Sequence, residues 1–256
     1  MLKLHGLTKH YRGQIAVADL TLQVEEGELL ALVGGSGSGK TTTLKMINRL
    51  IEPSSGTVLI GDRDVAEFAP HELRRRIGYA FQEVGLFPHM TVAENIGITP
   101  TLLGWTDHDV AQRVEELLQL VELDPSDVMS RRPDQLSGGQ QQRVGVARAL
   151  AARPRVMLLD EPFGALDPLT RQRLQESFLR IHRDLQLTVV FVTHDMIEAL
   201  ALGDRIAVMQ EGRLAQVDTP AALLHSPAGD YVRDLFDTPR REAQLLESLA
   251  MGTVVS

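Results

Sequence analysis

Short apolar stretches alternate with polar ones along the chain, and their spacing predicts the secondary structure. Near the N-terminus, residues 2–7 and 20–24 carry leucine or valine at alternating or nearly alternating positions, as half-buried strands do. Residues 29–33 are apolar throughout, which is typical of a strand buried on both faces. After a glycine-rich break, residues 41–50 have helical spacing, and residues 57–60 predict another strand.

From about residue 91 to residue 152 the spacing is helical. Apolar positions between 110 and 121 mark one face of a helix, and Thr106 with Asp109 has the spacing of a capping box. Ser137 stands where an N-cap would begin another helix. Strand-like runs then return at residues 156–159, 188–192, 206–209 and 214–217. A helical insert is therefore expected to divide an α/β core.

The same pattern predicts how the single domain is organised. We expect an α/β core formed by residues 1–84 and 153–220, with a helical insert at residues 85–152. Residues 221–256 are expected to form a short helical tail, since leucines recur there at helical spacing.

Composition narrows the class of protein. The chain has 256 residues, of which 43% are hydrophobic, and 26 Lys and Arg stand against 34 Asp and Glu, for a net charge of −8. This balance argues against a surface that coats nucleic acid. The chain has no cysteine, which excludes disulfides and thiolate chemistry. No apolar run approaches the roughly 20 residues that span a bilayer, so we expect a soluble chain.

The glycine-rich break fits the phosphate-binding pattern G-x-x-x-x-G-K-[ST], between a strand and a helix. Glycines let backbone N–H groups converge on phosphates, Lys40 would reach the β- and γ-phosphates, and Thr41 would offer its hydroxyl to Mg²⁺. The flanking strand and helix disfavour the alternative of a flexible turn. The segment consists of Gly34, Gly35, Ser36, Gly37, Ser38, Gly39, Lys40 and Thr41.

An acidic pair follows the apolar strand at residues 156–159. Asp160 would lie at the carboxyl end of this strand, where open α/β sheets bind ligands, and it suits the Mg²⁺ shell. Glu161 would then stand beside the γ-phosphate, in a position to activate a water molecule. An acidic pair can also cap a helix or face solvent, but the phosphate loop upstream favours the catalytic interpretation.

Ser137, Gly138 and Gly139 form a second candidate site for a phosphate at a predicted helix start. A chain with one phosphate loop needs only one such phosphate-binding site, so this second site is expected to bind the nucleotide of a partner chain. In isolation these residues could equally be an ordinary serine-capped helix.

These motifs together carry a family resemblance. LSGGQQQR at residues 136–143, with the phosphate loop before it and LLDEPFGALD at residues 158–167 after it, resembles the ATP-binding-cassette family. The resemblance runs from residue 2 to about residue 217. It implies an α/β fold with a phosphate-loop nucleotide-hydrolase core, an N-terminal antiparallel β subdomain and an α-helical insert subdomain.

The resemblance also implies roles for single residues. Tyr11 matches the aromatic that stacks on adenine, and Gln82 matches the glutamine that joins the Mg²⁺ and water shell. Asp167 matches a loop that crosses the dimer interface, and His194 matches the histidine that contacts the γ-phosphate. The signature would close on the γ-phosphate of the opposite protomer. Thr42 and Gln140 complete the expected nucleotide-binding set.

The activity that the resemblance implies is Mg²⁺-dependent ATP hydrolysis by two copies of the chain, with two ATP molecules between them. The segment 85–96 is similar to the region of prokaryotic importers that receives a membrane-embedded permease. The chain is then expected at the cytoplasmic face of the membrane. A solute-binding protein would be an indirect partner, and no binding to nucleic acid is expected.

Residues 45–51, 85–96 and 161–167 together most resemble the importers of glycine betaine, choline and related osmoprotectants. Alternatives are an importer of another solute, such as an amino acid or a polyamine, and a cassette ATPase that does not act in transport. A third class is a phosphate-loop kinase or GTPase. A kinase would not explain residues 136–140, and a GTPase would need a guanine-reading Asn-Lys-x-Asp sequence, which is absent.

Overall fold

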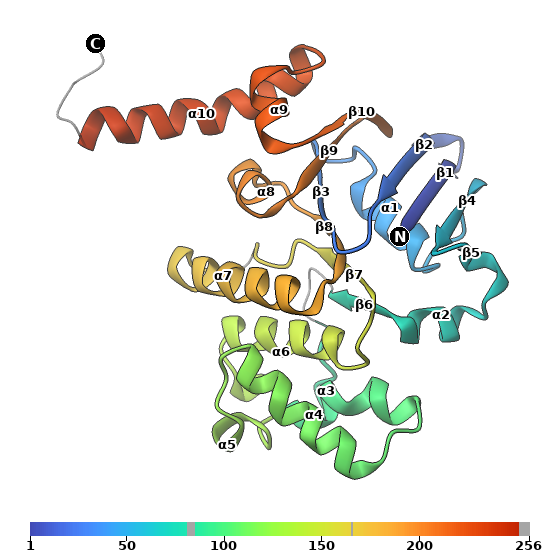
Figure 1. Cartoon of the computed structure of the whole chain (residues 1–256), viewed down its shortest axis with the longest axis vertical. Helices are drawn as coiled ribbons and strands as arrows, with labels where there is room; N and C mark the ends of the chain where they lie inside the picture. Colours follow the sequence, from blue (N-terminus) through green and yellow to red (C-terminus); the bar gives the residue numbers. More distant parts are fainter. Residues whose placement is uncertain (81–84, 165, 251–256) are drawn as a thin grey trace.

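The computed structural model describes residues 1–80, 85–164 and 166–250, and the strands in these ranges form two sheets (Figure 1). A four-stranded sheet has the order β2-β1-β4-β5, and a six-stranded sheet has the order β10-β9-β3-β8-β7-β6. The strands are β1 (Leu2–Tyr11), β2 (Gln14–Val24), β3 (Leu29–Val33), β4 (Ser55–Ile60), β5 (Arg63–Asp64), β6 (Ile77–Ala80), β7 (Val156–Asp160), β8 (Thr188–Val192), β9 (Arg205–Gln210) and β10 (Arg213–Asp218).

Helices separate these strands along the chain. They are α1 (Lys40–Ile47), α2 (Pro70–Arg76), α3 (Val92–Leu102), α4 (Asp107–Leu120), α5 (Pro125–Val128), α6 (Gly138–Leu150), α7 (Pro168–Leu185), α8 (Met196–Leu202), α9 (Pro220–His225) and α10 (Asp230–Ala250), with short 3₁₀ turns at Val65–Glu67 and Pro133–Gln135. Within the described ranges, no helix combines the length and apolarity needed to cross a membrane.

The six-stranded sheet is parallel from β9 to β6, and only β10 runs antiparallel to its neighbour. Its central strands are buried on both faces, which explains their uninterrupted apolar sequences. Alternate side chains enter two different cores: Leu29, Ala31 and Val33 join one, and Leu30 and Leu32 join the other. The first core includes the insert, and the second includes the antiparallel sheet and α1.

The helices α3 to α6 gather at one end of the molecule (Figure 1), and α6 packs against β6, α3 and α4. β6 is the edge strand of the large sheet, and α6 of the insert packs against it. The segments that follow β3, β7 and β8 lie at the carboxyl ends of these parallel strands, and they carry sequence motifs.

Two local expectations need correction. The helix expected at residues 41–50 ends at Ile47, because Arg49 adopts a left-handed conformation (φ 48°). The N–H groups of Arg49 and Leu50 then bond back to the carbonyls of Met46 and Lys45, which is the Schellman arrangement that terminates a helix.

The capping box expected at Thr106 and Asp109 is only half formed. The Thr106 hydroxyl accepts from the N–H of Asp109, as predicted. The Asp109 carboxylate, however, accepts from the Thr106 hydroxyl at 2.7 Å, and no bond to the Thr106 N–H is present. Aspartate is one methylene shorter than the glutamate of a full box. The N-cap expected at Ser137 is confirmed, with Gln140 completing a full box.

Candidate nucleotide-binding site

The sheet brings the sequence motifs to one edge. Asp160, the last residue of β7, is level with Val192 of β8, and Val192 is level with Leu32 of β3. The phosphate loop begins after Val33, so it starts at the same edge as Asp160, with β8 between them, although more than a hundred residues separate them in the chain. Parallel α/β sheets bind ligands at this carboxyl edge.

The first and last glycines of the phosphate loop are required by close backbone contacts. Gly34 has φ 144°, and a Cβ atom there would lie 2.1 Å from the carbonyl oxygen of Met209 in β9. Gly39, the N-cap of α1, has φ 100°, and its Cβ would lie 2.5 Å from the carbonyl oxygen of Ala16. The loop therefore follows a path that only glycine permits at both ends.

Lys40 is folded back over this loop. Its ammonium donates to the carbonyl oxygens of Gly34 at 2.7 Å and Gly35 at 2.9 Å. Burial lowers the pKa of Lys40, and the nearby carboxylates of Glu161 and Asp160 oppose that shift. A cation that is partly desolvated and held by loop carbonyls is suited to a phosphate ligand.

Thr41 and Asp160 meet at the base of the loop, where the Thr41 hydroxyl donates to Asp160 Oδ1 at 3.0 Å. Burial raises the pKa of Asp160, while the Thr41 hydrogen bond and Lys45 act in the opposite direction. A hydroxyl and a carboxylate are hard oxygen donors of the kind that Mg²⁺ prefers, so these two residues fit a magnesium ion.

Glu161 and His194 form a second pair at the same edge, with 3.2 Å between Glu161 Oε2 and His194 Nδ1. The Glu161 side chain is 21% exposed and the His194 side chain 67% exposed, so the pair opens toward solvent. The N–H of Glu161 donates to the carbonyl of Val192 at 3.0 Å, which ties the turn after β7 to β8. A carboxylate and an imidazole can both act on protons here.

The signature residues lie on a different body of the fold. Ser137 caps α6, and both Ser137 and Gly138 are exposed. α6 packs against β6 and against the other insert helices α3 and α4, whereas α1 packs against β2, β7 and β8. A Cβ atom on Gly138 would meet no atom of the described chain within 4 Å. The start of α6 is thus exposed and has open space beside Gly138.

The other predicted residues vary in their placement. Tyr11 ends β1 with 44% exposure, and the ammonium of Lys9 lies 5.2 Å from the centroid of its ring. Asp167 caps α7, and its bonds to Thr170 lower the pKa of Asp167. Within the loop Ser38 is buried, whereas Ser36 and Gly37 are exposed. Thr42, in α1, is partly buried. Gln82 lies outside the described residues.

Sequence reasoning missed two residues that organise these segments. Asn95 is fully buried in α3, and Tyr231 of α10 contacts the phosphate loop. An amide between the apolar positions Val92 and Ile96 was a signal for a buried hydrogen-bonding role. For Tyr231 no such signal exists, because its partner is 196 residues away.

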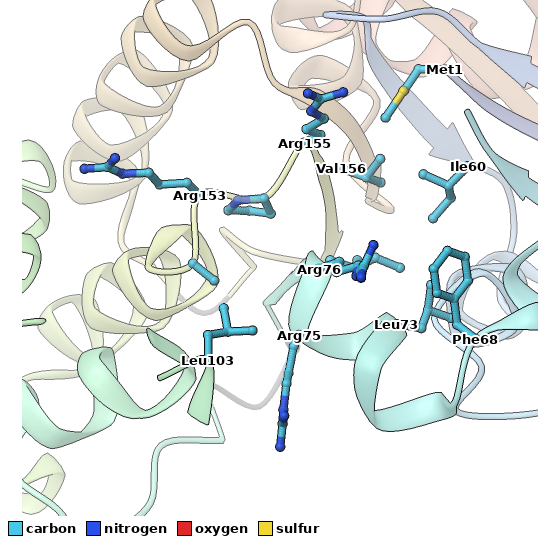
Figure 2. Close-up of a pocket in the computed structure, with 13 residues that line it drawn as sticks. Met1, Ile60, Phe68, Leu73, Arg75, Arg76, Leu103, Arg153, Arg155 and Val156 are labelled. Carbon is cyan, nitrogen blue, oxygen red and sulfur yellow. The ribbon is translucent and has the colours of Figure 1, made fainter. Parts of the chain in front are cut away.

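A hollow of about 430 Å³ lies at the opposite edge of the sheet, by the first residues of β6 and β7, Ile77 and Val156 (Figure 2). Figure 2 shows the side chain of Arg76 next to Phe68, while Arg153 extends away to the side. None of the phosphate-loop residues lines this hollow. The arrangement of functional groups, rather than the size of a hollow, therefore locates the candidate site.

Comparisons with known proteins agree with this fold and site. A phosphate-loop α/β core with a helical insert defines the class of ATP-binding cassettes, and the family described as "ABC transporter" matches residues 17–164. The chain belongs to the ABC transporter family. Cassette MJ0796, solved as a dimer bound to ADP and Pi, is 34% identical with a TM-score of 0.79, covering 86% of this chain and 99% of that one. The expected fold class is thereby confirmed.

Two curated relatives are similar over nearly the whole chain. The carnitine transport ATP-binding protein OpuCA of Listeria monocytogenes is 51% identical over 94% of this chain. The glycine betaine uptake system ATP-binding protein YehX of Escherichia coli is 49% identical over 100% of this chain and 82% of that protein. The chain spans 60% of the length of the Listeria protein.

Proposed function

We propose that this chain is the ATP-hydrolysing subunit of an importer for osmoprotectants such as glycine betaine, choline or carnitine. The observation that carries the proposal is the meeting of Lys40, the Thr41–Asp160 pair and the Glu161–His194 pair at one sheet edge. The names of the relatives support the solute class. The chain would act at the cytoplasmic face of the membrane, beside a permease and, indirectly, a solute-binding protein.

The residues divide the work of phosphoryl transfer between charge and positioning. Lys40 and the loop N–H groups bind the phosphates, and Tyr11 stacks on the adenine. Glu161 accepts a proton from the attacking water, and His194, 3.2 Å from it, contacts the γ-phosphate. A magnesium ion held by Thr41 and Asp160, with Gln82 as a further ligand, neutralises phosphate charge when it is bound.

Two copies of the chain would complete each site. Because Ser137 and Gly138 at the N-terminus of α6 are exposed, this helix start suits an anion supplied by another molecule. A head-to-tail pair would place Ser137, Gly138 and Gly139 of one copy against the γ-phosphate held by the other, with Asp167 at the interface. The solved structures of MJ0796 are dimeric, which supports a pair of copies.

A permease would dock where the core meets the insert. A hollow of about 300 Å³ lies there, lined by residues of β6, α2, α3 and the end of α6, with Phe87 at its rim. Arg148 of α6 donates to the carbonyl of Gly85 at 2.7 Å, and its guanidinium lies 5.9 Å from the centroid of the Phe87 ring. This hollow suits a short helix from the permease, because residues of both the α/β core and the helical insert line it, and these two parts must move together.

Asn95 holds the rim of this hollow in place. Its side-chain oxygen accepts from the N–H of Phe87 at 2.8 Å, and its amide nitrogen donates to the carbonyls of Phe87, Met90 and Thr91. Replacing Asn95 by alanine leaves these groups without their partner, so we expect the unfolding free energy to fall by about 1–3 kcal/mol. Urea unfolding measures this loss.

The matched control for this substitution is Gln112→Ala, which removes an amide that is exposed on α4. That change is expected to cost less than about 0.5 kcal/mol. Asn95→Ala should also speed proteolytic cleavage between residues 86 and 91. Equal stability of the two variants would contradict the role given to Asn95.

The solute is tested by transport. The chain is expressed together with the permease and binding-protein genes that adjoin its own, in a host without osmoprotectant uptake. We expect ATP-dependent accumulation of labelled glycine betaine, choline or carnitine, and none with Glu161→Gln. Accumulation of a polyamine or an amino acid instead would assign another solute. A chain that purifies without any membrane protein and binds DNA would refute the importer.

A further inference from the structure

The peptide unit that joins Gly34 to Gly35 is held at both of its polar ends. Its carbonyl oxygen, on Gly34, accepts from the ammonium of Lys40 at 2.7 Å. Its N–H, on Gly35, donates to the hydroxyl of Tyr231 at 2.9 Å. Rotation of this peptide would turn the carbonyl away from Lys40 and the N–H away from the tyrosine at the same time, so both bonds resist it.

The Tyr231 hydroxyl also reaches the neighbouring strand. It donates to the carbonyl oxygen of Met209 in β9 at 3.4 Å, while it accepts from Gly35. A hydroxyl can do both at once. The same Met209 carbonyl is the atom that a Cβ on Gly34 would strike. Tyr231 thus ties the start of the phosphate loop to the strand against which that loop is packed.

The helix that carries Tyr231 is anchored to the core near its start. Val232 and Phe236 are buried, and they belong to the same core as Leu223 of α9 and Ala199 of α8. Tyr231 itself is partly buried against this core. Beyond these turns α10 extends away from the rest of the molecule (Figure 1). The tyrosine therefore lies in the part of α10 that packs on the core.

We propose that Tyr231 is a positioning residue for ATP binding, because its hydroxyl fixes the Gly34–Gly35 peptide of the phosphate loop. This proposal rests on the proposed ATPase function. With the hydroxyl present, the Gly34–Gly35 peptide is already ordered before nucleotide arrives. Without it, the loop must become ordered when ATP binds. The free energy of this ordering lowers the affinity for ATP and leaves the rate of the chemical step unchanged.

The test uses Tyr231→Phe, which keeps the ring and removes only the hydroxyl. We expect the Kd for Mg·ADP and the KM for ATP to rise about three- to tenfold, with kcat unchanged within about twofold. In protein labelled with ¹⁵N-glycine, the Gly35 amide should exchange with solvent faster, because its acceptor is gone. Exchange of glycines remote from the loop should not change.

The control is Leu235→Ala, which loosens the packing of α10 and leaves the hydroxyl in place. Leu235→Ala should lower the free energy of unfolding more than it changes the ADP affinity. The Gly35 amide of this variant should exchange with solvent at the rate seen in the unmodified chain. The proposal is overturned if Tyr231→Phe binds ADP with unchanged affinity, or if Gly35 exchange does not accelerate. Failure of the unmodified chain to bind ADP or ATP would instead refute the proposed function.

Discussion

Replacement of Glu161 by glutamine is expected to lower ATP hydrolysis by about 10²–10⁴-fold, which is the usual contribution of a positioned general base. Glutamine has the size of glutamate, so it can occupy the same position 3.2 Å from His194 Nδ1. It cannot accept a proton from water. Lys40, Thr41 and Asp160 are unchanged, so ATP binding should persist within about twofold of the unmodified chain.

Because this variant binds ATP without consuming it, it should accumulate as a dimer when Mg·ATP is added. Size-exclusion chromatography with and without nucleotide measures the dimer, and release of inorganic phosphate measures turnover. Glu115→Gln is the matched control, since it makes the same change in charge at an exposed position on α4. Ordinary turnover by Glu161→Gln would exclude Glu161 as the base, and a dimer that forms without ATP would exclude nucleotide-driven association.

Replacement of Gly138 by aspartate is expected to reduce hydrolysis by at least about 10²-fold, comparable to the loss of a hydrogen-bond donor to developing charge. A Cβ atom at this position meets no atom of the described residues within 4 Å, and a carboxylate at a helix N-terminus favours folding. The chain should therefore fold with its usual stability and bind ADP normally. In the pair of copies, the carboxylate would repel the partner's γ-phosphate.

Mixing variants tests whether each site is shared between two chains. Lys40→Ala disables a phosphate loop and Gly138→Asp disables a signature, so a mixed pair retains one site with both parts intact. If copies exchange freely, equal mixing should restore about a quarter of the unmodified activity, because half of the pairs are mixed and each has one intact site. Activity that stays at the level of the separate variants would contradict the shared site.

The sequence was most informative where function depends on neighbouring residues. The phosphate loop is read from one short segment because each glycine acts on its own backbone, and Lys40 and Thr41 follow in the same turn. The strands at 156–160 and 188–192 were recognisable because their burial on both faces leaves uninterrupted apolar runs. The cap at Ser137 was predictable since its partner Gln140 is three residues away.

It was less informative where backbone conformation overrides side-chain pattern. The spacing of apolar residues continued to Leu50, but α1 ends at Ile47, because Arg49 adopts the left-handed conformation. A left-handed arginine has no sequence signature, because glycine is the residue expected at such a position. The Thr106–Asp109 pair likewise had the correct spacing but a side chain too short for the second bond.

What the sequence determined by itself was therefore the fold class, the phosphate loop and the family. These follow from periodicity, from local backbone geometry and from the order of motifs. Only the tertiary structure decided which distant groups meet: Thr41 with Asp160, Glu161 with His194, and Gly35 with Tyr231. Each of these contacts depends on strand order and helix packing, since polar atoms about 3 Å apart belong to residues that are 33 to 196 positions apart in the chain.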